Sequence, residues 1–97
     1  MNKELTDYYR SSISCQDAFS SAINALERAE RENVFPVKVN FRFDNQGMKI
    51  FGKGKGFEIS LKFNEKDLDL FLDLSFLLKP AKGKIISSIE NELSKYL

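Results

Sequence analysis

Four stretches of the chain alternate apolar and polar side chains with a period of two, as β-strands do when they bury one face. They cover residues 37–43, 48–51, 57–63 and 68–76, and short turn segments separate them. Strands joined by such short turns pair antiparallel with their chain neighbours. The pattern therefore predicts a four-stranded antiparallel meander with one apolar face that needs a cover.

Helical patterns flank these strands on both sides. Ser14 is a candidate N-cap with Asp17 in the first turn, and apolar residues follow at helical spacing from Phe19 to Ala29, which predicts a helix over about 15–32. Lys79-Pro80 marks a later boundary. The apolar stripe beyond it consists of Ile85, Ile86, Ile89, Leu93, Tyr96 and Leu97.

These elements predict one α+β domain over residues 14–97, in the order α-β-β-β-β-α, with both helices packed on the same face of the sheet. Residues 1–13 have weak periodicity and are expected to form an N-terminal arm or a short strand. Residues 4–10 stay undecided between strand and coil.

A four-residue turn at Asp44–Gly47 would determine the register of the first hairpin. The expected pairs are Phe43 with Met48, Phe41 with Ile50, Val39 with Gly52 and Val37 with Gly54. The core side of the second strand would then lack side chains at its glycine end. We expect bulk from a helix to fill that vacancy, with a small cavity as the alternative.

The other face of the sheet is expected to be charged unevenly. It is basic on the first two strands, where Arg42 would oppose Lys49 and Lys38 would oppose Lys53, and acidic on the fourth, the expected edge strand. The third strand is mixed, and Lys62 would oppose Asp69 there. The candidate interface residues are Lys38, Arg42, Lys49, Phe51, Lys53, Asp69, Phe71 and Asp73.

This charge distribution suits a symmetric partner. In a two-fold dimer each basic half would face the acidic half of the other copy, and Phe51 and Phe71 would supply apolar contact. We therefore expect a homodimer or a protein partner on the open face. A solvated sheet with two incidental phenylalanines is the alternative.

Composition excludes the commonest catalytic mechanisms. The chain has no histidine, so it has neither an imidazole-activated nucleophile nor an imidazole metal ligand. Its one cysteine, Cys15, excludes an internal disulfide and a multi-cysteine metal site. We expect a protein that is not an enzyme and has no metal or cofactor.

Charge and hydropathy bear on the partners and the compartment. Fifteen basic residues against fourteen acidic ones leave a net charge of +1, which argues against nucleic acid as a partner. The N-terminus has no apolar core of a targeting signal, and no run approaches the roughly 18 apolar residues of a transmembrane helix. We therefore expect a cytoplasmic protein.

Two further segments are candidate sites. Lys79, Lys82 and Lys84, with Gly83, cluster at the start of the last helix, where free backbone amides and ammonium groups would suit an anion or an acidic partner; ordinary surface lysines are the alternative. The glycines at 52–56 lie between two strands, so they match neither common phosphate-binding motif and predict a bulge or a kinked hairpin connection.

Residues 74–85, Leu-Ser-Phe-Leu-Leu-Lys-Pro-Ala-Lys-Gly-Lys-Ile, resemble the signature of the polyhydroxyalkanoic acid system proteins, a small bacterial family. In that family a strand runs into an apolar pair, a basic residue or serine, a proline, and then Lys-Gly-basic-Ile and a terminal helix. The chain departs from the family at Ala81, where an aromatic is common, and in its N-terminal segment, where a short strand usually precedes the first helix. The resemblance implies a bacterial cytoplasmic setting and association with polyester storage granules, without an established activity.

Three functions are compatible with these observations. The leading prediction is a non-enzymatic binding or assembly module that uses the open sheet face and the lysine segment. The alternative is a lipid or hydroxyacyl carrier with a cavity between the helices and the glycine end of the sheet. A weaker alternative is a single-stranded nucleic-acid platform made by Arg42, Lys49, Phe51 and Lys53.

Overall fold

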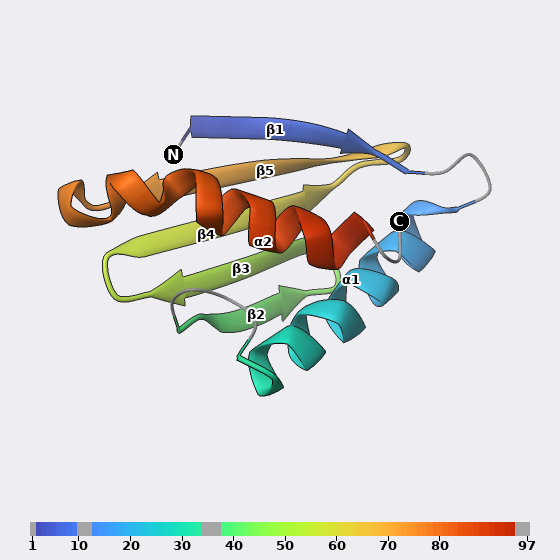
Figure 1. The fold of residues 1–97 in the computed structure, drawn as a ribbon. Helices are drawn as coiled ribbons and strands as arrows, with labels where there is room; N and C mark the ends of the chain where they lie inside the picture. Colours follow the sequence, from blue (N-terminus) through green and yellow to red (C-terminus); the bar gives the residue numbers. More distant parts are fainter. Residues whose placement is uncertain (1, 10–12, 34–37, 95–97) are drawn as a thin grey trace.

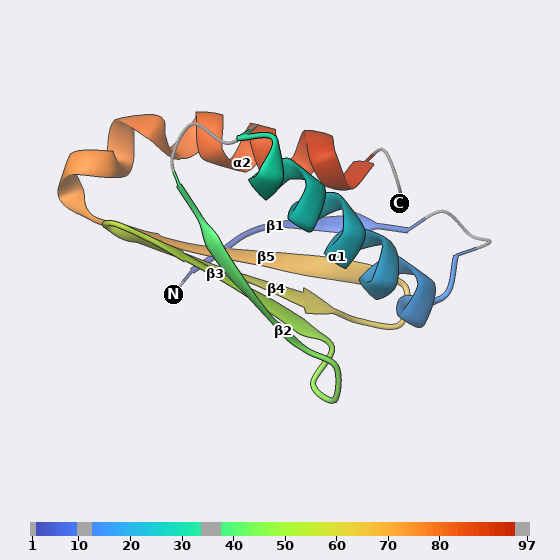
Figure 2. The ribbon, with the colours of Figure 1, turned by 90° about the horizontal axis from the view of Figure 1, so that it is seen from below.

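The computed structural model is α+β: an antiparallel sheet with two helices over one of its faces (Figures 1 and 2). It describes residues 2–9, 13–33 and 38–94. The strands are β1 (Asn2–Tyr8), β2 (Asn40–Asp44), β3 (Lys49–Gly54), β4 (Phe57–Phe63) and β5 (Asp67–Leu74). The helices are α1 (Cys15–Arg31), a 3₁₀ helix η1 (Phe76–Ala81) and α2 (Lys82–Ser94).

The sheet has five strands in the order β1-β5-β4-β3-β2, so the prediction of four strands is wrong. The N-terminal stretch, undecided from sequence, forms β1 and pairs antiparallel with β5. A register shift between Lys3 and Leu5 interrupts the alternation of β1, which is why this strand carries no clean period of two. As a result β5 lies inside the sheet and is not an edge strand.

The first helix follows the predicted signals closely. The Ser14 hydroxyl oxygen accepts a hydrogen bond from the Asp17 backbone N–H at 3.1 Å, as an N-cap does. Apolar side chains of α1 and α2 lie against the sheet, among them Phe19, whose ring meets Phe63 edge-on at 5.4 Å, and Ile89. The predicted stripe residues Tyr96 and Leu97 fall outside the described residues.

The register of the first hairpin differs from the prediction by two residues. Phe41 lies opposite Gly52 and Phe43 lies opposite Ile50. The cause is the turn: the Asp44 carboxylate accepts a hydrogen bond from the Gly47 N–H at 3.0 Å, and Met48 adopts a positive φ of 54°. Met48 therefore belongs to the turn instead of facing Phe43.

The vacancy beside the strand glycines is filled by other strands, so the expectation of bulk from a helix is wrong. A Cβ on Gly52 would lie 2.5 Å from Ile59 Cγ2 and 2.9 Å from Phe41 Cε1. A Cβ on Gly54 would collide with the ring of Phe57. The two-residue shift brings the Phe41 ring over Gly52, and close packing then requires glycine there. The predicted partner of Gly54, Val37, falls outside the described residues.

The remaining glycine of this segment has a conformational role. Lys55 and Gly56 form the tight connection between β3 and β4, and Gly56 has a φ of 84°. Its carbonyl oxygen accepts a hydrogen bond from the Ser75 N–H at 2.7 Å. The segment 52–56 is thus a strand end and a hairpin turn, which agrees with the interpretation of a hairpin connection.

Within the described ranges, no helix is long and apolar enough to cross a membrane.

Candidate binding face

The face of the sheet turned away from the helices, called here the open face, carries three cross-strand rows (Figure 2). In order from β2, the middle row is Arg42, Phe51, Ser60, Phe71 and Lys3. The row nearer the Lys55-Gly56 turn is Asn40, Lys53, Glu58 and Asp73. The row nearer the Asp44 turn is Asp44, Lys49, Lys62, Asp69 and Thr6.

Seven of the eight predicted interface residues lie in these rows, and Lys38 lies just before β2 and is exposed. They divide into a β3 triplet (Lys49, Phe51 and Lys53) and a β5 triplet (Asp69, Phe71 and Asp73), with β4 between the two. Each triplet places a half-buried phenylalanine between two side chains of one charge sign.

The predicted charge pairs are corrected in part. Arg42 lies opposite Phe51 instead of Lys49, and Lys53 lies opposite Asn40 instead of Lys38. The two predicted like-charge pairs between β2 and β3 are therefore absent, but Lys49 lies opposite Lys62 across β3 and β4. The pairing of Lys62 with Asp69 is confirmed.

Asp69 is held in place by neighbours on three sides. Its carboxylate accepts hydrogen bonds from the Thr6 hydroxyl at 2.6 Å and from the Asn64 amide at 3.1 Å, and Lys3 Nζ lies 3.9 Å away. These groups, the Thr6 hydroxyl first, lower the pKa of Asp69. Asp73 differs: it is exposed, and no ion pair links it to any residue that the structure describes.

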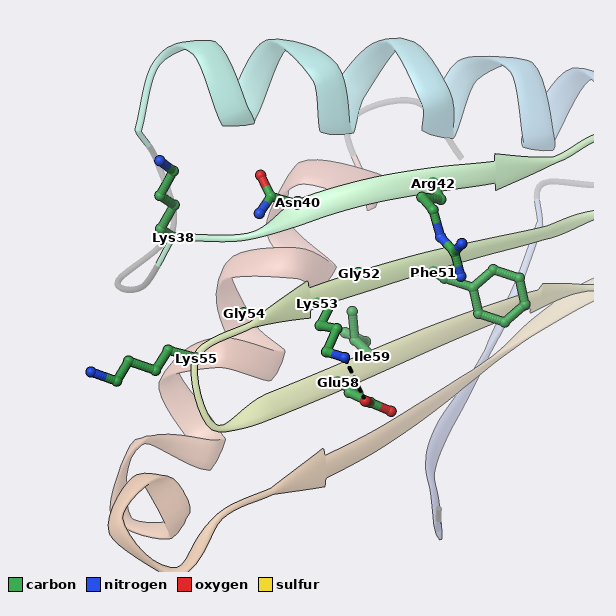
Figure 3. Close-up of a pocket in the computed structure, with 10 residues that line it drawn as sticks. All are labelled: Lys38, Asn40, Arg42, Phe51, Gly52, Lys53, Gly54, Lys55, Glu58 and Ile59. Atoms are coloured by element: carbon green, nitrogen blue, oxygen red, sulfur yellow. Dashed lines mark ion pairs between the residues drawn. The ribbon is translucent and has the colours of Figure 1, made fainter.

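A broad pocket of about 930 Å³ lies over the basic half of the open face (Figure 3). Its charged lining residues are Lys38, Arg42, Lys53, Lys55 and Glu58, and Phe51 forms one wall. Lys53 Nζ lies 3.8 Å from Glu58 Oε1, which leaves the other three cations without an ion pair among the described residues. A smaller pocket of about 320 Å³ lies at the adjacent end of β3, β4 and β5.

The lysine segment is exposed, but its members differ. Lys82 Nζ pairs with Glu4 Oε1 of β1 at 2.7 Å, and its backbone N–H donates to the Lys79 carbonyl oxygen. Because η1 runs directly into α2, the first amide of α2 is already used. Lys79 and Lys84 have no ion pair within the described part of the chain. A Cβ on Gly83 would meet nothing within 4 Å, so neither packing nor backbone angle requires a glycine there.

Cys15 and the acidic side chains are the groups to examine for nucleophilic chemistry or metal binding. The Cys15 thiol donates a hydrogen bond to the Phe63 carbonyl oxygen at 3.6 Å, and burial raises the pKa of this thiol, which favours its protonated form. Across residues 2–9, 13–33 and 38–94, no group of three or more acidic, cysteine or histidine side chains is placed to hold a metal ion.

Three residues that contribute to the open face could not be placed from sequence. Lys55 belongs to a segment that the sequence predicts only as a connection, and the structure places it at the same end of the pocket as Lys38 (Figure 3). Lys3 and Thr6 belong to β1, whose alternation is interrupted. For Lys55, the one available sequence signal was its position between two glycines, Gly54 and Gly56.

Comparison of the chain with family models, with curated proteins and with solved structures found no match.

Proposed function

We propose that this chain is a non-enzymatic assembly module that forms a homodimer through the open face of its sheet. The observation that carries the proposal is that the β3 triplet and the β5 triplet occupy the same cross-strand rows. One strand thus presents Lys-Phe-Lys where the strand two places away presents Asp-Phe-Asp. The β3 triplet of one copy thus complements the β5 triplet of another, while Arg42 and Lys3, at the two ends of the middle row, carry the same charge and would oppose each other.

The symmetry follows from the position of β4. A two-fold axis that runs along β4, between two facing sheets, lays β3 of one copy over β5 of the other. The matched rows then oppose Lys49 to Asp69, Phe51 to Phe71 and Lys53 to Asp73 of the second copy, twice per dimer. Facing sheets keep their strand directions within about 30° of each other, so this nearly parallel alignment is an ordinary sheet packing.

The centre of the interface is less favourable than its flanks. Along the two-fold axis, Glu58 of one copy approaches Glu58 of the other, and Lys62 approaches Lys62. Each has a neighbour of opposite charge in its own chain, since Lys53 pairs with Glu58 at 3.8 Å and Asp69 lies opposite Lys62. The flanking pairs therefore determine the specificity of the dimer, and the axis contributes little.

The size of the face sets the expected affinity. Five strands about 4.8 Å apart span roughly 24 Å, and strands of this length run about 20 Å. Pairing two such faces buries on the order of 1,000 Å², near the lower limit of specific interfaces. We expect a dimer that dissociates in the micromolar range and weakens as salt screens its charge pairs.

Sedimentation velocity over a range of concentrations tests this function. The parent chain should shift from monomer to dimer as its concentration rises, and Phe71→Ser should stay monomeric because it removes an apolar contact on each side of the axis. Lys84→Ser, on the exposed surface of α2, is the matched control and should dimerise like the parent. A parent chain that stays monomeric at every concentration would refute the proposal.

The resemblance in residues 74–85 supports a setting for this dimer, namely the surface of a polyester granule in a bacterial cytoplasm. The lysine segment is exposed on the helix side of the molecule, so the open face stays available for pairing. Co-sedimentation with purified polyhydroxybutyrate granules tests this setting. Binding should fall when Lys79 and Lys84 are replaced by alanine, and equal binding of parent and variant would remove the lysine segment from the proposal.

The carrier function needs a cavity between the helices and the sheet. The two described pockets are lined by strand and turn residues, and none of their lining residues belongs to α1 or α2. The vacancy beside Gly52 and Gly54 is occupied by Phe41 and Phe57. For these reasons we prefer the assembly module to the lipid or hydroxyacyl carrier.

A further inference from the structure

We propose that the pocket over β2 and β3 binds a nucleotide unit, with its base against Phe51 and its phosphates between Lys38 and Lys55. This inference goes beyond the proposed dimer. Phe51 and Lys53 line the pocket and also belong to the proposed dimer contact, so the nucleotide unit binds the monomer and should oppose self-association. The inference rests on the charge of the pocket, on the placement of its one aromatic wall and on its size.

The charge of the pocket is strongly one-sided. Four cationic residues line it against one carboxylate, and that carboxylate, Glu58, pairs with Lys53. Lys38, Arg42 and Lys55 remain without an ion pair among the described residues. Three like charges around one concavity repel one another, and a multivalent anion between them relieves that repulsion.

The lining is divided along the strands into an aromatic end and a cationic end. Figure 3 shows Arg42 reaching toward the Phe51 ring at one end, and Lys38 and Lys55 at the other. Phe51 lies in β3 and Lys55 is the first residue of the turn after it, four residues on, so the two are on the order of 10 Å apart along the chain. A ligand that uses both ends therefore has a planar group and an anionic group joined by a spacer, as base, sugar and phosphate are.

The volume of the pocket favours a ligand larger than a simple anion. A volume of about 930 Å³ far exceeds what one phosphate fills, and it lies in the range of small-molecule sites. The basic surface also ends at β4, because Glu58 and Asp73 close it on the side of β5. The pocket thus admits one or a few nucleotide units, either a free nucleotide or a short part of a single strand.

Calorimetric titration with ATP, tripolyphosphate and adenosine tests the assignment. ATP should bind at least tenfold more tightly than either part alone, because only ATP uses both ends of the pocket. Phe51→Leu should weaken ATP about fivefold or more, the effect of losing one stacked base. Tripolyphosphate binding as tightly as ATP would overturn the inference, since the site would then be a non-specific basic surface.

Two double variants separate the pocket from general electrostatics. Lys38→Ala with Lys55→Ala should weaken ATP at least tenfold, whereas Lys79→Ala with Lys84→Ala removes the same charge elsewhere and should leave ATP binding unchanged. Equal losses in both double variants would overturn the inference. Lys38 and Lys55 lie outside the matched triplets, so sedimentation of the first variant should still show the parent's self-association.

A second ligand distinguishes a free nucleotide from a nucleotide within a single strand. A short single-stranded oligoadenylate that binds more tightly than ATP, with an affinity that falls steeply with salt, assigns the pocket to a single strand. ATP binding as tightly as the oligonucleotide, or more tightly, assigns it to a free nucleotide. Failure of all ligands to bind would refute this inference and leave the homodimer proposal untouched.

Discussion

Lys53 of β3 and Asp73 of β5 flank Glu58 of β4 in a single cross-strand row, so a cation and an anion stand two strands apart on the same face. Lys49 and Asp69 flank Lys62 in the same way, two repeats of the pleat further along the strands. The near-zero net charge of the chain therefore conceals an ordered separation of charge. The proposed homodimer rests on this arrangement.

Two glycines should respond in opposite directions to the same substitution. Gly52→Ala places a Cβ 2.5 Å from Ile59 Cγ2 inside the core, and we expect it to lower the free energy of unfolding by about 1–3 kcal/mol. Gly83→Ala meets no atom within 4 Å and gains helix propensity in α2, so it should raise that free energy by about 0.5–1 kcal/mol. Urea unfolding monitored by circular dichroism measures both, and a stable Gly52→Ala variant would contradict the packing described for β3.

The hydrogen bond from Thr6 to Asp69 should stabilise the edge strand β1. Thr6→Val removes a 2.6 Å bond to a carboxylate, and we expect it to cost about 1 kcal/mol at neutral pH. Because the folded state lowers the pKa of Asp69, this stabilisation is present above the ordinary value of 3.8 and is lost as the pH falls through the folded value. Urea titrations at neutral and acid pH should show the difference between parent and variant shrinking in acid.

Glu90 of α2 should affect the pH dependence of stability in the direction opposite to that of Asp69. Burial, and the neighbouring Asp7 of β1, raise the pKa of Glu90 above its ordinary value of 4.5. The folded state therefore binds this proton more tightly than the unfolded chain, and stability falls as the pH rises from 4.5 through the raised value. Glu90→Gln removes that loss and should unfold at higher urea than the parent at pH 7, with no gain at pH 4. A parent-like midpoint at both pH values would contradict it.

The strands with strict alternation were predictable, and the irregular ones were not. Phe57 to Phe63 alternates without interruption, and β4 has those bounds. In β1 the irregularity after Lys3 removes the period of two. The register of β2 depended on a side-chain bond from Asp44 and on the positive φ of Met48, which alternation alone does not reveal. The open face was still identified correctly, because a shift of two residues keeps every side chain on its face.

The details of the site depended on this register. A shift of two residues changed which charges face one another, so the predicted opposition of Arg42 and Lys49 was wrong. The pairing of Lys62 with Asp69 was predicted correctly because a short turn joins β4 to β5. Four of the charged and aromatic residues of the pocket, Lys38, Arg42, Phe51 and Lys53, were predicted on the open face, but Lys55 was not, because it lies in a glycine segment without alternation.

The most direct test of the homodimer exchanges the charges of one matched pair, leaving Asp69 and its hydrogen bonds intact. Lys53→Glu and Asp73→Lys are both on exposed positions, and each variant alone should dimerise at least tenfold more weakly than the parent because it opposes like charges twice per dimer. An equimolar mixture of the two variants restores opposite charges at both contacts. Sedimentation equilibrium of the mixture should therefore recover a dimer of parent-like affinity, and a mixture as monomeric as its components would contradict the pairing of β3 with β5 of a second copy.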